Sequence, residues 1–123
     1  MDRNPVGWFE IYVQDMARAK RFYESVIGAT LHKLDSPQLE MWAFPATQGR
    51  MGAGGALVRM EGCASGGNST LVYFNCDDCA TQAGRVVKAG GRIQREKFSI
   101  GQYGFIALAI DTEGNMFGLH SMQ

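Results

Sequence analysis

The sequence lacks the features that mark nucleic-acid-binding and membrane proteins. Its 12 basic and 12 acidic residues cancel, and no run of like charge occurs. A nucleic-acid-binding domain normally carries a basic stripe, and an interfacial membrane helix carries a basic face. No apolar stretch approaches the roughly 18 residues of a membrane span, and the amino-terminal residues contain none of signal-peptide length. We therefore expect a cytoplasmic protein with no nucleic-acid or membrane partner.

Cysteine is also too scarce for a disulfide framework. The three cysteines are an odd number, whereas such frameworks need pairs. Cys76 and Cys79 form a CxxC motif at a predicted strand-to-helix junction. The two aspartates between them oppose a thiolate, and Cys63 in a glycine-rich loop does not complete a four-ligand zinc site. We expect Cys76 and Cys79 to pack as small apolar side chains.

The first half of the chain predicts a strand, a helix and three further strands. Residues 7–13 are rich in β-forming side chains. Asp15 is a predicted helix N-cap, and apolar residues at helical spacing follow as far as Gly28, which ends the helix. Strands are then expected at 29–34, 39–44 and 56–60, with a glycine-rich loop at 47–55.

The second half repeats this order. A strand at 70–76 precedes a helix capped by Asp77 or Asp78 and ended by Gly90 and Gly91. Strands are expected near 92–96 and 105–110, then a turn at 111–115 and a last strand through Phe117 and His120. An offset of 63 residues pairs Asp15 with Asp78, Ala17 with Ala80, Gly28 with Gly91, Ser36 with Ser99 and Gly55 with Gly118.

An internal duplication explains this repeat. At 123 residues and 46% hydrophobic content, the chain is long enough for one domain over residues 1–123 with a real core. We expect module one at about 5–60, module two at about 69–123 and a linker at about 61–68.

Three segments carry a family resemblance: WFEIYVQDMARAKRFYESVIG at 8–28, LVYFNCDD at 71–78 and DTEGNMFGLHS at 111–121. With these segments the chain resembles the vicinal oxygen chelate superfamily of glyoxalases, bleomycin-resistance proteins and dioxygenases. It looks most like a lactoylglutathione-lyase-related branch that lacks the usual metal ligands. The resemblance implies an α+β fold, in which two βαβββ modules form a cupped, mostly antiparallel sheet with flanking helices. It also implies a homodimer.

The same resemblance implies four metal-ligand positions, and none of them holds a ligand residue here. Catalytic members of the family bind one divalent metal through His, Gln or Glu on the first and last strands of each module. Counted from the helix cap and from the D-x-x-G turn, these positions fall at Trp8, Gly55, Leu71 and Gly118. None of these side chains can donate a lone pair to a cation. We therefore expect no metal and no other cofactor.

Two titratable side chains stand two residues beyond the vacant positions. Glu10 follows Trp8 and His120 follows Gly118 at this spacing, and residues two apart on a strand share a face. We therefore predict that both point into the cup and act as a general acid–base pair. The alternatives are an ion pair that serves stability alone and a displaced metal site, for which two ligands are too few.

Five aromatic side chains are candidates for the walls of a ligand site: Trp8, Trp42, Tyr73, Tyr103 and Phe105. The offset of 63 makes Trp42 and Phe105 equivalent. Tyr103 lies in a loop whose glycines at 101 and 104 permit movement over a cavity. Because aromatic residues are commonly core residues, plain packing is the alternative for each. His32 is expected to be exposed to solvent.

Three functions remain open on the sequence. The favoured one is metal-independent binding of a small apolar or aromatic ligand in the cup. The second is a divalent-metal-dependent lyase, isomerase or dioxygenase with a displaced metal. The third is a non-catalytic accessory module of a dimer. The ligand and any reaction stay unidentified, because one fold serves many activities.

Overall fold

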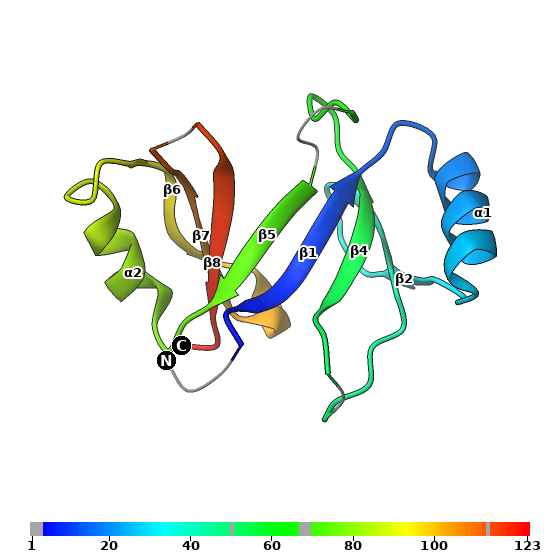
Figure 1. Cartoon of the computed structure of the whole chain (residues 1–123), viewed down its shortest axis with the longest axis horizontal. Helices are drawn as coiled ribbons and strands as arrows, with labels where there is room; N and C mark the ends of the chain where they lie inside the picture. The colour runs from blue at the N-terminus through cyan, green and yellow to red at the C-terminus, as the bar shows by residue number, and fades with distance from the viewer. Residues whose placement is uncertain (1–3, 50, 67–69, 113) are drawn as a thin grey trace. The chain divides into compact units, whose positions relative to one another are not determined.

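The computed structural model describes residues 4–49, 51–66, 70–112 and 114–123, and the chain divides into two compact units. The first unit is Trp8–Thr70, and the second joins the residues up to Gly7 with Leu71–Gln123. Each unit contains four paired strands and one helix (Figure 1). The expected linker at about 61–68 falls partly outside the described residues.

The first unit follows the predicted order. Its elements are β1 (Val6–Tyr12), α1 (Met16–Ile27), β2 (His32–Leu34), β3 (Glu40–Ala43) and β4 (Gly54–Arg59). The strand order is β2-β3-β4-β1, in which β1 and β4 pair in parallel and the other pairs are antiparallel. The caps of α1 are those expected: Asp15 accepts a hydrogen bond from the Arg18 N–H at 3.0 Å, and Gly28 has a left-handed φ of 78°.

The second unit repeats the arrangement. Its elements are β5 (Thr70–Asn75), α2 (Cys79–Val86), β6 (Arg92–Ser99), the short 3-10 helix η1 (Gly101–Tyr103), β7 (Phe105–Ile110) and β8 (Met116–Ser121). The strand order is β5-β8-β7-β6, with β5 and β8 parallel and the other pairs antiparallel. The α+β class with two βαβββ modules is therefore confirmed.

Strand β6 runs three residues further than predicted. Its pairing with β7 shifts register between Ile93 and Arg95 and again between Arg95 and Phe98. Such irregularities break the two-residue alternation by which a strand is recognised in a sequence. The strand is also the outermost of its order and is mostly charged, which suits an edge that must not pair with another chain.

Each helix packs on one face of its own strands. In the first unit the buried residues of this core are Val13, Met16, Leu31 and Leu57, with Ile11, Ala19, Tyr23, Trp42 and Phe44 packed against them. In the second unit they are Cys76, Cys79, Ala83, Ala107 and Leu119, with Phe74, Ile93, Phe105 and Phe117. The predicted packing role of Cys76 and Cys79 is confirmed. Over the described residues, no helix has the length and apolar character that crossing a membrane requires. We call the face opposite the helix the far face of each unit.

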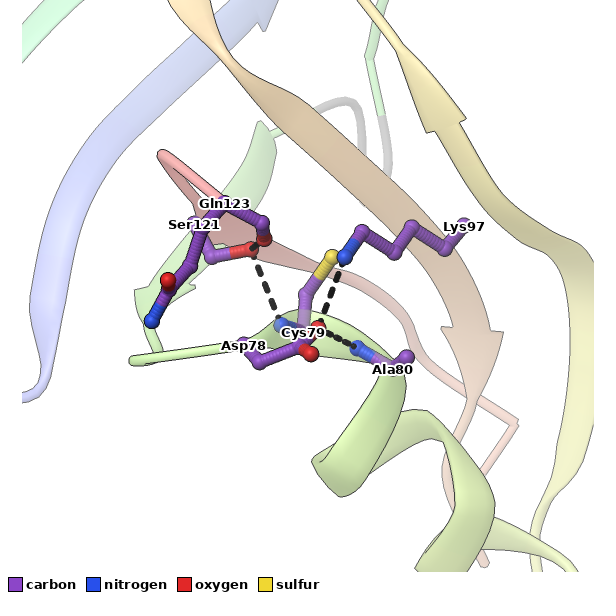
Figure 2. A network of polar contacts seen from close by, with 6 residues as sticks. All are labelled: Asp78, Cys79, Ala80, Lys97, Ser121 and Gln123. Carbon is purple, nitrogen blue, oxygen red and sulfur yellow. Dashed lines mark hydrogen bonds and ion pairs between the residues drawn. The ribbon is translucent and has the colours of Figure 1, made fainter.

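The end of the chain is tied to the start of α2 (Figure 2). The backbone N–H of Cys79 donates to the Ser121 hydroxyl at 2.9 Å, and this hydroxyl donates to the Gln123 carbonyl at 2.8 Å. Ser121 is only 2% exposed. One hydroxyl therefore satisfies a helix N–H that has no partner within the helix and also fixes the last residues.

The first turn of α2 carries an ion pair as well. The Asp78 carboxylate accepts hydrogen bonds from the Lys97 ammonium at 2.8 Å and from the Ala80 N–H at 3.0 Å (Figure 2). The hydrogen bond from Lys97, followed by that from Ala80, holds the pKa of Asp78 below its ordinary value. The predicted N-cap at this helix is therefore Asp78 and not Asp77.

The substitution Ser121→Ala should destabilise the protein by about 1–3 kcal/mol, because it leaves the buried Cys79 N–H without an acceptor. Urea unfolding of the full chain measures this loss. Ser65→Ala, at an exposed loop position, is the matched control and should change the free energy of unfolding by less than about 0.5 kcal/mol. Equal effects of the two substitutions would contradict the capping role.

The substitution Lys97→Met should raise the pKa of Asp78 towards its usual value. An aspartate whose folded pKa is lowered stabilises the fold above its unfolded pKa of about 3.9, and this contribution disappears as the pH falls through the folded pKa. We therefore expect Lys97→Met to move the acid unfolding midpoint to higher pH. Carbon-13 NMR titration of Asp78 measures the shift directly. Lys33→Met, which removes an exposed lysine from the first unit, should leave the Asp78 titration unchanged.

Candidate functional site

The far face of the first unit collects three polar or aromatic side chains from β1. Trp8 pairs with Gly54, Glu10 with Ala56 and Tyr12 with Val58 across the parallel β1–β4 ladder. The residues between them, including Ile11, belong to the helix-side core. Since alternate residues of a strand point to opposite faces, Trp8, Glu10 and Tyr12 share the far face.

The carboxylate of Glu10 is buried and held from both sides. Glu10 is 8% exposed. The Trp8 indole Nε1–H donates to its Oε2 at 3.2 Å, and the Tyr12 hydroxyl donates to its Oε1 at 2.8 Å. These donors offset part of the cost of removing a carboxylate from water. Tyr12 was not among the expected site residues, although the two-residue spacing that linked Trp8 with Glu10 also reaches it.

A small cavity in the first unit adjoins the Trp8 ring. It has a volume of about 220 Å³ and is lined by Pro45, Ala46, Thr47, Met51, Gly52, Ala53 and Gly54. A Cβ atom added to Gly54 would lie 3.3 Å from Trp8 Cζ3 and 3.4 Å from the Ala46 Cβ. The benzo edge of Trp8 therefore packs on the glycine that lines the cavity, while the indole nitrogen binds Glu10.

The far face of the second unit carries Tyr73, Asn75 and His120. Tyr73 pairs with Gly118, and Asn75 pairs with His120, across the parallel β5–β8 ladder. The Tyr73 ring lies directly over Gly118, because a Cβ there would be 2.2 Å from Tyr73 Cδ1. Tyr73 is buried and His120 is half-buried.

The imidazole of His120 is bound to a loop carbonyl. Its Nε2 lies 2.6 Å from the Tyr103 carbonyl oxygen. The carbonyl can only accept, so the Nε2–H donates. The side chain of Tyr103 is 43% exposed. The structure therefore brings Tyr103 to His120 through its backbone and not through its ring.

Two of the expected wall residues face the helices instead. Trp42 pairs with Leu57 of the first core, and the Lys20 ammonium of α1 lies 3.4 Å from its ring centroid. Phe105 packs against the second core, and the Lys97 ammonium lies 4.8 Å from its ring centroid. Plain packing, which was the alternative for each, is what the structure shows for Trp42 and Phe105.

The expected ligand position at Gly55 is also on the helix side. Gly55 pairs with Phe9, and a Cβ at Gly55 would lie 2.4 Å from Phe9 Cε1. The residue that corresponds to Gly118 is Ala56, because Ala56 pairs with Glu10 while Gly118 pairs with Tyr73, 63 residues later. The offset of 63 is therefore wrong by one residue in the last strand of the module.

The far-face residues do not fit the divalent metal that the resemblance implies for catalytic relatives. Trp8, Leu71 and Gly118 offer no side-chain donor, and the Tyr73 ring fills the space over Gly118. No group of three or more His, Cys, Asp or Glu side chains suited to a metal occurs within 4–49, 51–66, 70–112 and 114–123. Both Glu10 oxygens already accept hydrogen bonds. Glu10 belongs to the first unit and His120 to the second, so their action as a pair stays a prediction.

Comparison with known proteins places these units in a described family. Residues 6–119 match the model of the Glyoxalase/Bleomycin resistance protein/Dioxygenase superfamily. No curated protein matches the chain.

Solved structures with other titles share the fold. The methylmalonyl-CoA epimerase of Mycobacterium tuberculosis is 16% identical, with a TM-score of 0.71 over 97% of this chain and 88% of that chain. A variant of the Streptomyces coelicolor methylmalonyl-CoA epimerase in complex with 2-nitronate-propionyl-CoA is 17% identical, with a TM-score of 0.69 over 96% of each chain. A variant of 4-hydroxymandelate synthase from S. coelicolor is 15% identical, with a TM-score of 0.69 over 99% of this chain and 39% of that chain. At these identities the likeness shows the fold alone.

The substitution Tyr12→Phe should destabilise the protein by about 1–3 kcal/mol, because it removes a donor from a buried carboxylate. Chemical unfolding at neutral pH measures the change. Tyr23→Phe is the control, since the Tyr23 ring packs edge-on against Phe44 and needs no hydroxyl for that contact. If both substitutions cost the same, the Tyr12 hydroxyl does not support Glu10.

Proposed function

Because the chain belongs to the Glyoxalase/Bleomycin resistance protein/Dioxygenase superfamily, we propose that it binds a small apolar or aromatic molecule without a metal. The observation that carries this proposal is the position of Trp8. Its ring lies between the cavity at Gly54 and the buried carboxylate of Glu10. One residue thus connects an apolar space with a fixed charge.

The size of the cavity supports a ligand of about one aromatic ring. Ligand pockets for drug-sized molecules begin at roughly 300 Å³, whereas a dry cavity of about 150 Å³ is enough for benzene. The 220 Å³ next to Gly54 lies between these values. Its lining is mainly small or apolar, and Thr47 is its one hydroxyl-bearing residue. These features favour an uncharged, flat ligand.

Glu10 acts in this proposal as a positioning residue. Its hydrogen bond to Nε1 fixes the rotation of the Trp8 indole, so that the benzo edge stays against Gly54. A wall that is already ordered loses little side-chain entropy when a ligand binds, and this preorganisation raises affinity. The second hydrogen bond, from Tyr12, holds the carboxylate in turn.

The donor set argues for binding without a metal. A protein site for zinc needs three or four ligands, and calcium needs six to eight oxygen atoms. The far-face positions that correspond to the ligands of metal-dependent relatives hold Trp8, Leu71 and Gly118. The cytoplasmic location and the homodimer that the family resemblance implies are parts of the same proposal.

Single-ring aromatic compounds such as toluene should stabilise the chelator-treated protein. A ligand at 100 times its Kd adds about 2.7 kcal/mol to the free energy of unfolding when it binds only the folded state. Gly54→Val, which presses on Trp8 and narrows the cavity, should weaken binding at least roughly tenfold, equal to about 1.4 kcal/mol. Thermal unfolding over a ligand titration measures both effects.

The control variant is Gly84→Ala, because a Cβ at Gly84 meets nothing within 4 Å. It should bind toluene as the unmodified protein does. Stabilisation that appears only after zinc, nickel or manganese is added would favour a metal-dependent lyase, isomerase or dioxygenase instead. If no compound of a broad aromatic set stabilises the protein, the accessory-module alternative takes the place of this proposal.

A further inference from the structure

The second unit holds a histidine whose two ring nitrogens have different surroundings. His120 lies on β8, opposite Asn75 of β5 and Ile106 of β7. The Cys76 N–H donates to the His120 carbonyl at 2.8 Å, which fixes the backbone at this point. The ring is half-buried on the far face. Its position is therefore set by strands on both sides.

The Tyr103 carbonyl determines which nitrogen carries the hydrogen. Because a carbonyl oxygen only accepts, Nε2 must be the protonated nitrogen at 2.6 Å. In the neutral ring Nδ1 is then the unprotonated nitrogen, with a lone pair that accepts hydrogen bonds. The loop thus selects one tautomer of His120.

This loop is itself held in place. The Ile100 N–H donates to the Gly104 carbonyl at 2.8 Å, and the Gly104 N–H donates to the Gly101 carbonyl at 3.1 Å. Gly104 has a φ of 102°, and a Cβ there would lie 2.5 Å from the Ser121 carbonyl oxygen. Only glycine allows the loop to approach β8 this closely. The Tyr103 carbonyl is therefore a fixed partner and not a chance contact of a loose segment.

The neighbours of His120 define the chemistry of a ligand. Ile106 is buried and apolar, the Tyr103 ring is partly exposed, and Asn75 supplies an amide on the adjacent strand. The Asn75 amide lies against Gly7, since a Cβ at Gly7 would be 2.1 Å from Asn75 Oδ1. This apolar surface with one acceptor nitrogen suits an uncharged ring that bears a hydroxyl or N–H group.

We propose that His120 Nδ1 accepts a hydrogen bond from the hydroxyl or N–H group of an aromatic ligand on the far face of the second unit, with the Tyr103 carbonyl as the positioning group. This site goes beyond the proposed cavity site, because it lies in the other unit and uses different residues. It requires no metal and no covalent step.

Nitrogen-15 NMR of the imidazole rings tests the first part. The protein has two histidines, and the exposed His32 on β2 is an internal reference. At about pH 8, where imidazole is neutral, His120 should show a single tautomer with hydrogen on Nε2. His32 should show an average of both tautomers. Hydrogen on Nδ1 of His120, or averaging like that of His32, would overturn the inference.

Phenol and anisole test the second part, because they share a ring and only phenol donates a hydrogen bond. Phenol should shift the His120 Nδ1 resonance and bind about two- to tenfold more tightly than anisole at this site, the range expected for one hydrogen bond. Gly104→Ala should reduce this preference, because it displaces the Tyr103 carbonyl. Equal shifts from both compounds, or none from either, would refute the site.

The same experiment separates this site from the proposed cavity. Toluene and anisole carry no donor and should still bind beside Trp8 if the proposed function is correct. A protein that binds toluene but shows no phenol-specific shift at His120 would retain the proposed function and lose this inference. A phenol-specific shift that persists in Gly54→Val would support the His120 site even if the cavity binds nothing.

Discussion

The structure depends on the parallel pairing of the first and last strands of each module. Parallel strands cannot be joined by a tight hairpin, so the chain between β1 and β4, or between β5 and β8, must cross over through a helix and further strands. The helix covers one face of its strands and draws every second side chain into a common core. The remaining side chains are left for the far face. Glu10 and His120 reach that face for the same reason, although one stands on a first strand and the other on a last strand.

Close packing of aromatic rings on glycine is the second constraint. Tyr73 covers Gly118 and Phe9 covers Gly55, in each case at distances that no Cβ would permit. In the second unit this ring occupies the strand position at which metal-dependent relatives carry a ligand. The absence of a donor at Gly118 and the presence of the Tyr73 ring are therefore linked, since a larger side chain at 118 would expel the ring. The far face offers aromatic surface where those relatives offer a cation site.

The polar groups that remain on the far faces are fixed by their neighbours. The Glu10 carboxylate is bound by Trp8 and Tyr12, and the His120 imidazole is bound by the Tyr103 carbonyl. Fixed groups of this kind are costly to bury unless each hydrogen bond is made. They also give a ligand a surface that needs little reorganisation. Family membership leaves the ligand open, because the same fold carries many activities, and these local arrangements are what distinguish this chain.

The sequence by itself determined the order of the elements, both N-caps, the packing of Cys76 and Cys79, and the lack of metal donors, because each depends on residue type and short spacing. Only the tertiary structure decided the register of the last strands. From Gly28 to Ala56 the first module spends 28 residues, whereas the second spends 27 from Gly91 to Gly118. A difference of one residue moves a side chain to the opposite face of a strand, which is why Gly55 was misplaced. The contacts of Tyr12 with Glu10 and of Tyr103 with His120 also needed the structure, because rotamers and loop approach are set by packing and not by local sequence.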